Sequence, residues 1–247
     1  MKKFIKNQID DYKLLLRSVP SLFVSLYVVS VILMNLMANK SINTGLTWLA
    51  LDCGFTVSWM SFLTMDTITK RFGPKAATKL SIMAVGVNLL CCAIMFGISK
   101  IPGNWGEYYT FNNDIANKAL NNTFGGSWYV VFGSMLAFLT SAIVNNFLNS
   151  SIGKKLKNNN FMSYAVRSYV STAVGQFVDN FVFAFVVSHV LFGWNMTQVV
   201  FCSLAGMVVE LLCEVVFSPF GYRVVKQWEF DRVGQAYIDK HAKGVSK

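Results

Sequence analysis

Charged side chains are scarce in this sequence. Aspartate, glutamate, lysine and arginine make up 14% of its 247 residues, against about a quarter in an ordinary soluble domain, while 54% of the residues are hydrophobic. A soluble helical protein would place a charge every few positions along each amphipathic helix. Three long stretches here, 18–38, 80–99 and 124–153, carry no charge at all. The composition excludes an ordinary soluble domain and indicates a protein that lies in lipid.

These stretches also lack the alternation of polar and apolar residues that strands show. Each approaches the roughly 20 apolar residues that a helix needs to cross the hydrocarbon layer. Lipid offers no partner to backbone N–H and C=O groups, so spans without barrel-type alternation must be helices. The sequence therefore predicts an all-α membrane protein with six transmembrane helices. The predicted spans are 19–38, 46–66, 77–99, 126–150, 163–192 and 197–219.

The basic residues are distributed unevenly. The formal net charge is +10, but 19 of the 22 lysines and arginines lie in four segments, and only Lys40, Lys100 and Lys118 occupy the alternate loops. The four segments are 2–17, 70–79, 154–167 and 223–247. Because basic residues gather on the cytoplasmic side of membrane proteins, this distribution predicts six spans with both termini in the cytoplasm. The charge implies contact with the lipid bilayer and not with nucleic acid.

The predicted spans form a single six-helix domain, 19–222, between a cytoplasmic amphipathic segment, 1–18, and a cytoplasmic tail, 223–247. The first segment carries too many charges and too short an apolar core for a signal peptide, and its pattern is typical of an interfacial helix. The loop 100–126 is long, rich in asparagine and aromatic residues, and expected outside the cell. It is either a lid over a binding cavity or a solvated connector.

Motifs of enzymes and pumps are missing. The sequence has only His189 and His241, no HExxH motif, no CxxC pair and no glycine-rich phosphate loop, so a zinc hydrolase or a nucleotide-driven pump lacks its parts. We expect no metal and no cofactor. The five cysteines all lie in apolar runs and predict no disulfide. An intramembrane enzyme that uses Asp179 and the glutamates of the last span as an acid/base pair is the alternative, but it has no visible nucleophile.

A polar stripe lies within the fifth predicted span. Gln176, Asp179, Asn180 and Phe183 recur at i, i+3, i+4 and i+7, so one helix face presents two amides, a carboxylate and an aromatic ring. An ionisable side chain in a span costs about 2.5–3.5 kcal/mol on insertion scales and usually faces a cavity or a partner. The stripe indicates a site for a planar ligand. The alternative is a polar patch that holds helices together.

Two glutamates share a face of the sixth predicted span. Glu210 and Glu214 lie one turn apart, and two nearby carboxylates in a low dielectric rarely both ionise, so one of them is expected to stay protonated. That arrangement suits proton coupling. Alternatively, Glu214 is close enough to the cytoplasm to meet water or a basic residue. Asp52, in the second predicted span, is a further acid within the hydrocarbon region.

Asparagines close two spans of opposite direction. Asn35 and Asn39 end the first, and Asn145 and Asn146 lie near the end of the fourth, which is consistent with an inverted repeat or with coincidence. Asp66, Arg71 and Gly73 form a polar turn after the second span. For this turn we favour a structural or gating role, in which Asp66 accepts backbone amides or pairs with the basic cluster, over direct contact with ligand.

Three motifs carry a resemblance to a known family. They are Asp66-Thr-Ile-Thr-Lys-Arg-Phe-Gly73, Gly175-Gln-Phe-Val-Asp179, and Glu214-Val-Val-Phe-Ser-Pro219-Phe-Gly-Tyr222. In their order and their positions relative to the spans, they resemble the D-x-x-T-x-x-x-G, G-Q-x-x-D and E-x-x-x-T-P-x-x-Y motifs of the VUT family of vitamin uptake transporters, also described as queuosine-precursor transporters. In one departure, a basic residue often stands where this chain has Glu210, and an acid there would favour a ligand that bears an amine.

The resemblance implies six helices arranged like the substrate-binding subunits of energy-coupling-factor transporters, in the bacterial cytoplasmic (inner) membrane. It implies uptake of a 7-deazaguanine base such as 7-cyano-7-deazaguanine, 7-aminomethyl-7-deazaguanine or queuine. Carboxylates accept the N–H groups of a guanine-like edge, amides serve its carbonyl and aromatic rings stack on its face. The substrate-binding candidates are Asn35, Asn39, Trp59, Asn145, Asn146, Gln176, Asp179, Asn180, Phe183, Glu210 and Glu214.

We favour a secondary transporter or facilitator that needs no ATPase module. The alternative is a vitamin-binding subunit of an ATP-driven energy-coupling-factor transporter. The expected partners are a small 7-deazapurine and the lipid bilayer. Monomers and homo-oligomers are both compatible with the sequence.

Overall fold

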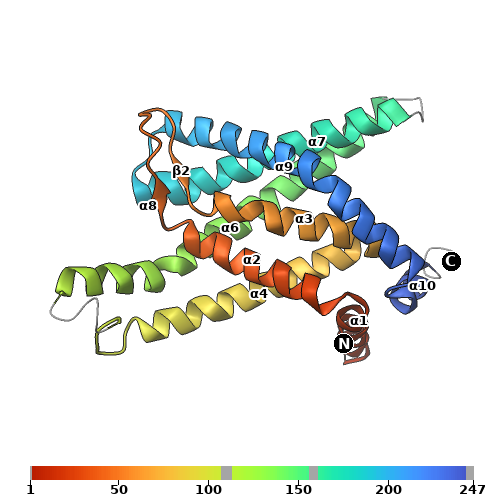
Figure 1. Ribbon diagram of the computed structural model, residues 1–247, viewed down its shortest axis with the longest axis horizontal. Coiled ribbons are helices and arrows are strands. Elements are labelled where there is room, and N and C mark those ends of the chain that lie inside the picture. The colour runs from red at the N-terminus through yellow and green to blue at the C-terminus, as the bar shows by residue number, and fades with distance from the viewer. Residues whose placement is uncertain (1, 107–112, 156–160, 243–247) are drawn as a thin grey trace. The chain divides into compact units, whose positions relative to one another are not determined.

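The computed structural model describes residues 2–106, 113–155 and 161–242, and almost all of them are helical (Figure 1). The helices are α1 Lys2–Ser18, α2 Ser21–Met37, α3 Phe55–Phe72, α4 Pro74–Ile98, α6 Asp114–Lys155, α7 Phe161–Phe183, α8 Val190–Phe192, α9 Met196–Phe230 and α10 Gln235–Ala242. A π-helix, η1 Ala184–His189, joins α7 to α8, and two short strands, β1 Ser41–Ile42 and β2 Leu51–Asp52, pair antiparallel. The helical class predicted from the sequence is confirmed.

Four segments of the described chain are long and apolar enough to cross a membrane. They are Pro74–Ile98, Asp114–Ser141, Ala173–Phe192 and Met196–Cys213, with a fifth if the bent pair Lys6–Ser18 and Ser21–Met37 forms one span. Their outer surfaces expose large apolar side chains such as Leu90, which is 60% exposed, and Leu212, which is 57% exposed. Water would penalise such a surface, and lipid would not.

The second predicted span, 46–66, is wrong in its first half. Residues 41–52 form a hairpin in which Ser41 pairs with Asp52, and the helix begins only at Phe55. The Asp52 side chain accepts a hydrogen bond of 2.8 Å from the Gly54 amide just before α3. The acid that the sequence placed inside a span therefore organises the start of a helix, as acids commonly do. Local side-chain bonding of this kind overrides an apolar run.

The loop predicted at 100–126 is shorter than expected. Helix α6 already begins at Asp114 and continues through the fourth predicted span. The Asn113 side chain accepts a 3.0 Å hydrogen bond from the Ala116 amide and so caps this helix. Part of the asparagine-rich segment belongs to α6, where Asn117 and Asn121 accept hydrogen bonds from Trp105. Residues 107–112, which would form the middle of a lid, lie outside the described residues.

The helix that contains the last predicted span, 197–219, continues beyond it. Helix α9 passes through Pro219 and continues to Phe230, so the predicted tail begins inside a helix. Beyond the proline, Val225 and Trp228 are buried, with 5% and 7% of their surface exposed. Their packing keeps this part of the helix ordered, because burial of apolar residues outweighs the loss of one backbone hydrogen bond.

The π-helix η1 packs closely on α6. A β-carbon at Gly133 would lie 2.2 Å from Val187 Cγ2, so only glycine lets the two segments approach this far. A π-turn disturbs the regular hydrogen bonding of a helix. Here the Tyr129 hydroxyl of α6 donates to the Val186 carbonyl at 3.1 Å. The rings of Phe181 and Phe185 stack with planes 7° apart, as do those of Phe185 and His189, with planes 16° apart.

The chain divides into two compact units. The first unit comprises 1–33, 57–88 and 213–247, and the second comprises 34–56 and 89–212. The core of the first unit includes Leu15, Ile68 and Tyr237. In the second unit α6 packs along α7, and small cores form around Val130 and Val199.

Candidate functional site

The polar stripe of α7 meets two neighbouring helices within the second unit. Ser141 Oγ of α6 donates a 2.8 Å hydrogen bond to Asp179 Oδ1. Asn180 Nδ2 lies 3.2 Å from Glu210 Oε2 of α9 and 2.9 Å from the backbone oxygen of Gln176. The structure thus brings together four of the predicted residues, Gln176, Asp179, Asn180 and Glu210. We call these four residues and Ser141 the α7 cluster.

A glycine sets the distance between α7 and α9. A β-carbon at Gly206 would lie 2.9 Å from both Cγ and Oδ1 of Asn180. The Asn180 amide therefore rests directly on the backbone of α9, one turn before Glu210. Sequence reasoning missed Gly206 and Ser141, because a small residue within an apolar run gives no sign of which helix lies against it.

The α7 cluster has more hydrogen-bond acceptors than donors. Gln176 Oε1 is buried and has no hydrogen-bond partner among the described residues. Asp179 accepts from Ser141 and Glu210 from Asn180, and no lysine, arginine or histidine in the described part of the chain pairs with either carboxyl. Buried acceptors without donors are costly, so the cluster suits a ligand that brings N–H or O–H groups.

Three predicted binding residues have contacts of their own. Asn39 Nδ2 donates to the Leu36 carbonyl at 3.0 Å and to Ser127 Oγ at 3.2 Å, which ties the end of α2 to α6. Asn35 is buried, with 4% of its surface exposed. Phe183, at the end of α7, packs against the core that contains Val130. The hydrogen bonds of Asn39 and the packing of Phe183 involve residues outside the α7 cluster.

The remaining candidates lie elsewhere or cannot be placed. Trp59 belongs to the first unit, where its ring stacks on Phe217 with centroids 4.6 Å apart. The side chains of Asn145, Asn146, Glu214 and Asp66 lie outside the part of the structure that is described.

Two of the three residues predicted to have a structural or gating role, Arg71 and Gly73, can be described, and both lie in the first unit. Arg71 donates through Nε and Nη2 to the Val233 carbonyl at 3.1 and 2.9 Å, and through Nη2 to Gln235 Oε1 at 3.3 Å. Gly73 has a φ of 84° between α3 and α4, in the left-handed region that favours glycine. Both residues have evident structural roles.

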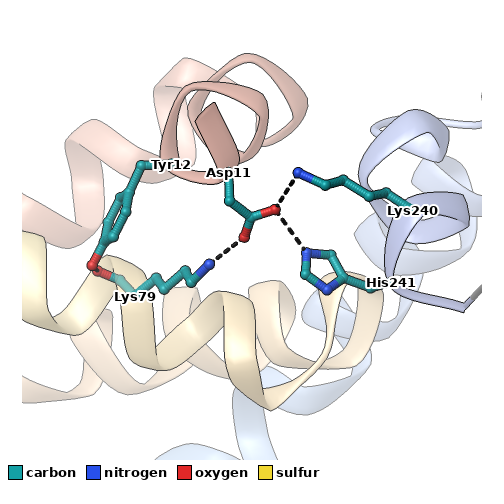
Figure 2. Close-up of polar contacts among 5 residues, drawn as sticks. All are labelled: Asp11, Tyr12, Lys79, Lys240 and His241. Carbon is teal, nitrogen blue, oxygen red and sulfur yellow. Dashed lines mark hydrogen bonds and ion pairs between the residues drawn. The ribbon is translucent and has the colours of Figure 1, made fainter. Parts of the chain in front are cut away.

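A second polar cluster lies in the first unit, at a site that the sequence did not reveal. Asp11 of α1 accepts hydrogen bonds from Lys79 of α4 and, at 2.7 Å, from Lys240 of α10 (Figure 2). His241 Nε2 lies 3.2 Å from the same carboxylate, and Tyr12 donates to the Lys79 carbonyl at 3.2 Å. We call these five residues the Asp11 cluster.

Opposite charges dominate the Asp11 cluster. Burial opposes ionisation of Asp11, but the hydrogen bonds from Lys240 and Lys79 prevail and lower its pKa to about 2. A cavity of about 940 Å³ opens beside the cluster. Its lining residues are Asn7, Gln8, Asp10, Asp11, Pro74, Lys75, Thr78, Lys79, Ile82, Lys240 and His241.

Comparison with known proteins places the chain in a family. The family model described as "Putative vitamin uptake transporter" matches residues 52–224, well over half of the chain. The chain belongs to this family. The resemblance found in the sequence motifs is therefore confirmed, and the chain is a multi-pass membrane protein of a transporter family.

This member of the vitamin uptake transporter family is also similar to a named bacterial protein. A protein of Bacillus subtilis (strain 168) called "Probable queuosine precursor transporter" is 24% identical over 165 residues, which cover 67% of each chain. No solved structure matches the chain. The family region 52–224 contains the whole α7 cluster, whereas Asp11, Lys240 and His241 lie outside it.

Proposed function

We propose that this chain carries a small planar solute rich in N–H groups, a 7-deazaguanine base, inward across the bacterial cytoplasmic membrane. Membership of a vitamin uptake transporter family supports transport, and the name of the Bacillus subtilis relative supports a queuosine precursor as cargo. The single observation that carries the proposal is the surplus of buried acceptors in the α7 cluster.

The proposed binding mode matches donors of the base to these acceptors. A guanine-like edge presents a ring N–H and an amino group that Asp179 can accept together, since an ionised carboxylate offers two oxygens. Gln176 Oε1, which has no partner among the described residues, accepts a further N–H group. Phe183 stacks on the base, and Glu210 favours a base that carries an amine. Asn35, Asn39, Trp59, Asn145, Asn146 and Glu214 remain proposed contacts.

The proposed topology has six spans with both termini in the cytoplasm. Helices α2 and α3 supply the other two proposed spans. By length and composition, α2 counts as a span only together with α1, and α3 is not among the candidate spans. Helix α2 has no charged residue in its 17 positions, and α3 ends in Lys70 and Arg71, which would lie at the cytoplasmic surface. The chain then acts as a secondary transporter or facilitator without an ATPase module.

A thermal-shift measurement on the purified protein tests the binding mode. A ligand at 100 times its dissociation constant stabilises by about 2.7 kcal/mol. We expect a shift with a 7-deazaguanine base for the parent, and a roughly 10- to 100-fold weaker affinity for Asp179→Asn, because a hydrogen bond to a charged group contributes about 1.5–3 kcal/mol.

The control is Asp231→Asn, which changes an exposed acid whose side chain accepts a hydrogen bond from Gln227. It should bind as tightly as the parent. Absence of a shift with every deazapurine, or equal affinities for Asp179→Asn and the parent, would contradict the proposal.

The need for an ATPase module is tested separately. Uptake of labelled base is measured in cells that lack every energy-coupling module but express this chain. We expect uptake to persist there. Uptake that appears only when such a module is supplied would identify the chain as a vitamin-binding subunit instead.

A further inference from the structure

We propose that Glu210 binds a proton that this chain exchanges in each transport cycle, with Asn180 as the fixed partner of its carboxyl group. The inference rests on the proposed function, because it assigns the coupling ion to the same α7 cluster. Glu210, from α9, is also a proposed contact of the base, whereas the proposed acceptors of the ring N–H and amino groups, Asp179 and Gln176, come from α7.

The first argument is the burial of Glu210. Only 7% of its surface is exposed, and Glu210 lies within the apolar segment Met196–Cys213, which is long enough to span a membrane. A carboxylate that leaves water needs a counter-charge or several strong donors. In the described structure its side chain accepts a hydrogen bond of 3.2 Å from the neutral amide of Asn180. A protonated carboxylic acid satisfies this environment better than an anion does.

The second argument comes from the groups that face Glu210. From α7 the neighbouring acid is Asp179, which interacts electrostatically with Glu210. From α9 itself the neighbouring titratable group is Cys202, which also lies within range of Asp52 on β2. Within the described residues no cation pairs with any of these groups. Two carboxylates that lie near each other away from bulk water repel each other, so the pair favours a state that holds one proton.

The third argument separates a proton from a metal cation. The Asn180 amide directs an N–H toward Glu210 Oε2, and a donor in that position repels a cation bound to the same oxygen. In the described chain no three histidine, cysteine, aspartate or glutamate side chains lie together in a group that could hold a metal ion. Glu210 Oε1, the second carboxyl oxygen, accepts no hydrogen bond from the described residues, so it can carry the proton.

The test uses purified protein in proteoliposomes loaded with a 7-deazaguanine base. Counterflow of labelled base reports binding and translocation without net proton movement. Accumulation under an imposed pH gradient, at zero membrane potential, reports coupling. One pH unit supports about tenfold accumulation at one proton per solute, since tenfold in concentration and one pH unit represent the same 1.36 kcal/mol.

The variant Glu210→Gln is a permanently neutral analogue of the protonated acid. Because Glu210 is also a proposed contact of the base, accumulation is compared with counterflow in the same variant, and we expect Glu210→Gln to lose accumulation driven by the pH gradient relative to its own counterflow. The matched control, Glu229→Gln, removes an exposed glutamate that pairs with Lys226 and should behave as the parent in both assays. Accumulation by Glu210→Gln equal to that of the parent would overturn the inference.

Two further results in the parent protein decide against a proton. Accumulation that follows a sodium gradient and ignores the pH gradient would overturn the inference, as would counterflow without accumulation under either gradient. Absence of counterflow in the parent would overturn the proposed function itself, so the two failures are distinguishable.

A measurement on the parent alone remains decisive if Glu210→Gln does not fold. Calorimetric titration of the base in two buffers of different ionisation enthalpy counts the protons taken up or released on binding. We expect a count between zero and one that changes with pH. A count of zero at every pH from 5 to 9 would overturn the inference.

Discussion

Two buried acids of this chain have opposite surroundings. Asp11, 6% exposed, is held by two lysines and approached by a histidine, whereas Glu210, 7% exposed, contacts one neutral amide and lies near another acid. The two residues are buried to almost the same extent, so burial alone does not distinguish them. Their partners do, because counter-charges fix a carboxylate in its ionised form and their absence leaves it free to gain or lose a proton.

The difference assigns a role to each region. The Asp11 cluster ties α1, α4 and α10 together within the first unit and is complete as it stands. The α7 cluster contains acceptors that no described donor satisfies. A satisfied network stabilises a structure, while an unsatisfied one indicates a ligand.

Neutralising the two acids should have unequal effects on stability. Asp11→Asn leaves Lys79, whose side chain is only 20% exposed, without its counter-charge and should lower the free energy of unfolding by about 1–2 kcal/mol. The partial exposure of Lys240 and His241 keeps the loss below that of a fully buried pair. Glu210→Gln should change it by less than about 1 kcal/mol, because no charge loses a partner. Denaturant unfolding in detergent measures both.

Asp239→Asn, on the exposed side of α10, is the control for Asp11→Asn and should match the parent. An equal loss for the substitutions at Asp11 and Glu210 would break the comparison.

Sequence reasoning could not find the Asp11 cluster. Asp11 and Lys240 are separated by 229 positions, and nothing local distinguishes either from other charges of the predicted cytoplasmic segments. The face of α7 was predictable, because helical periodicity places Gln176, Asp179 and Asn180 together whatever surrounds them. The partners Ser141 and Glu210 depend on which helices lie beside α7, and that information is not local.

The same contrast explains the errors in the predicted spans. The apolar stretch before Phe55 looked like the start of a span, but the Asp52 side chain binds the Gly54 amide and begins the helix later. Short-range capping geometry competes with hydropathy there and prevails. The apolar run that became α4, Pro74–Ile98, was located to within a few residues, whereas α6 begins at Asp114, well before the predicted span, because Asn113 caps it.

Lowering the pH should remove the stabilising effect of Asp11, so that the parent and Asp11→Asn become more similar in stability. The pKa of Asp11 is lowered to about 2 in the folded chain from an ordinary value of 3.8, so the ionised form stabilises the fold above about pH 4 and stops doing so as the pH falls toward 2. Asp11→Asn lacks this group. The difference in melting temperature between parent and Asp11→Asn should therefore shrink between pH 5 and pH 2.5. A difference that stays constant over this range would show that Asp11 does not act through its charge.

The substitution Gly206→Ala should have the smallest effect, and we expect it to lower the free energy of unfolding by less than about 1 kcal/mol. The new β-carbon would displace the Asn180 amide, which is the movable end of its side chain, from its place beside Glu210. We expect the pH at which uptake is half-maximal to shift, because Glu210 loses its fixed partner. Gly126→Ala adds a β-carbon with nothing within 4 Å and is the control. An unchanged pH profile in Gly206→Ala would remove Asn180 from the proposed proton site.

The wide turn η1 has a consequence for the aromatic residues that lead away from the α7 cluster. In an α-helix, side chains four positions apart are rotated by about 40°, because one turn holds 3.6 residues, whereas a π-turn holds more than four. The sequence Phe177, Phe181, Phe185 and His189 crosses from one helix type to the other, so the rotation gained in α7 is given back in η1. Each of the four rings therefore stacks on the next, and deleting one residue from η1 would rotate His189 away from Phe185.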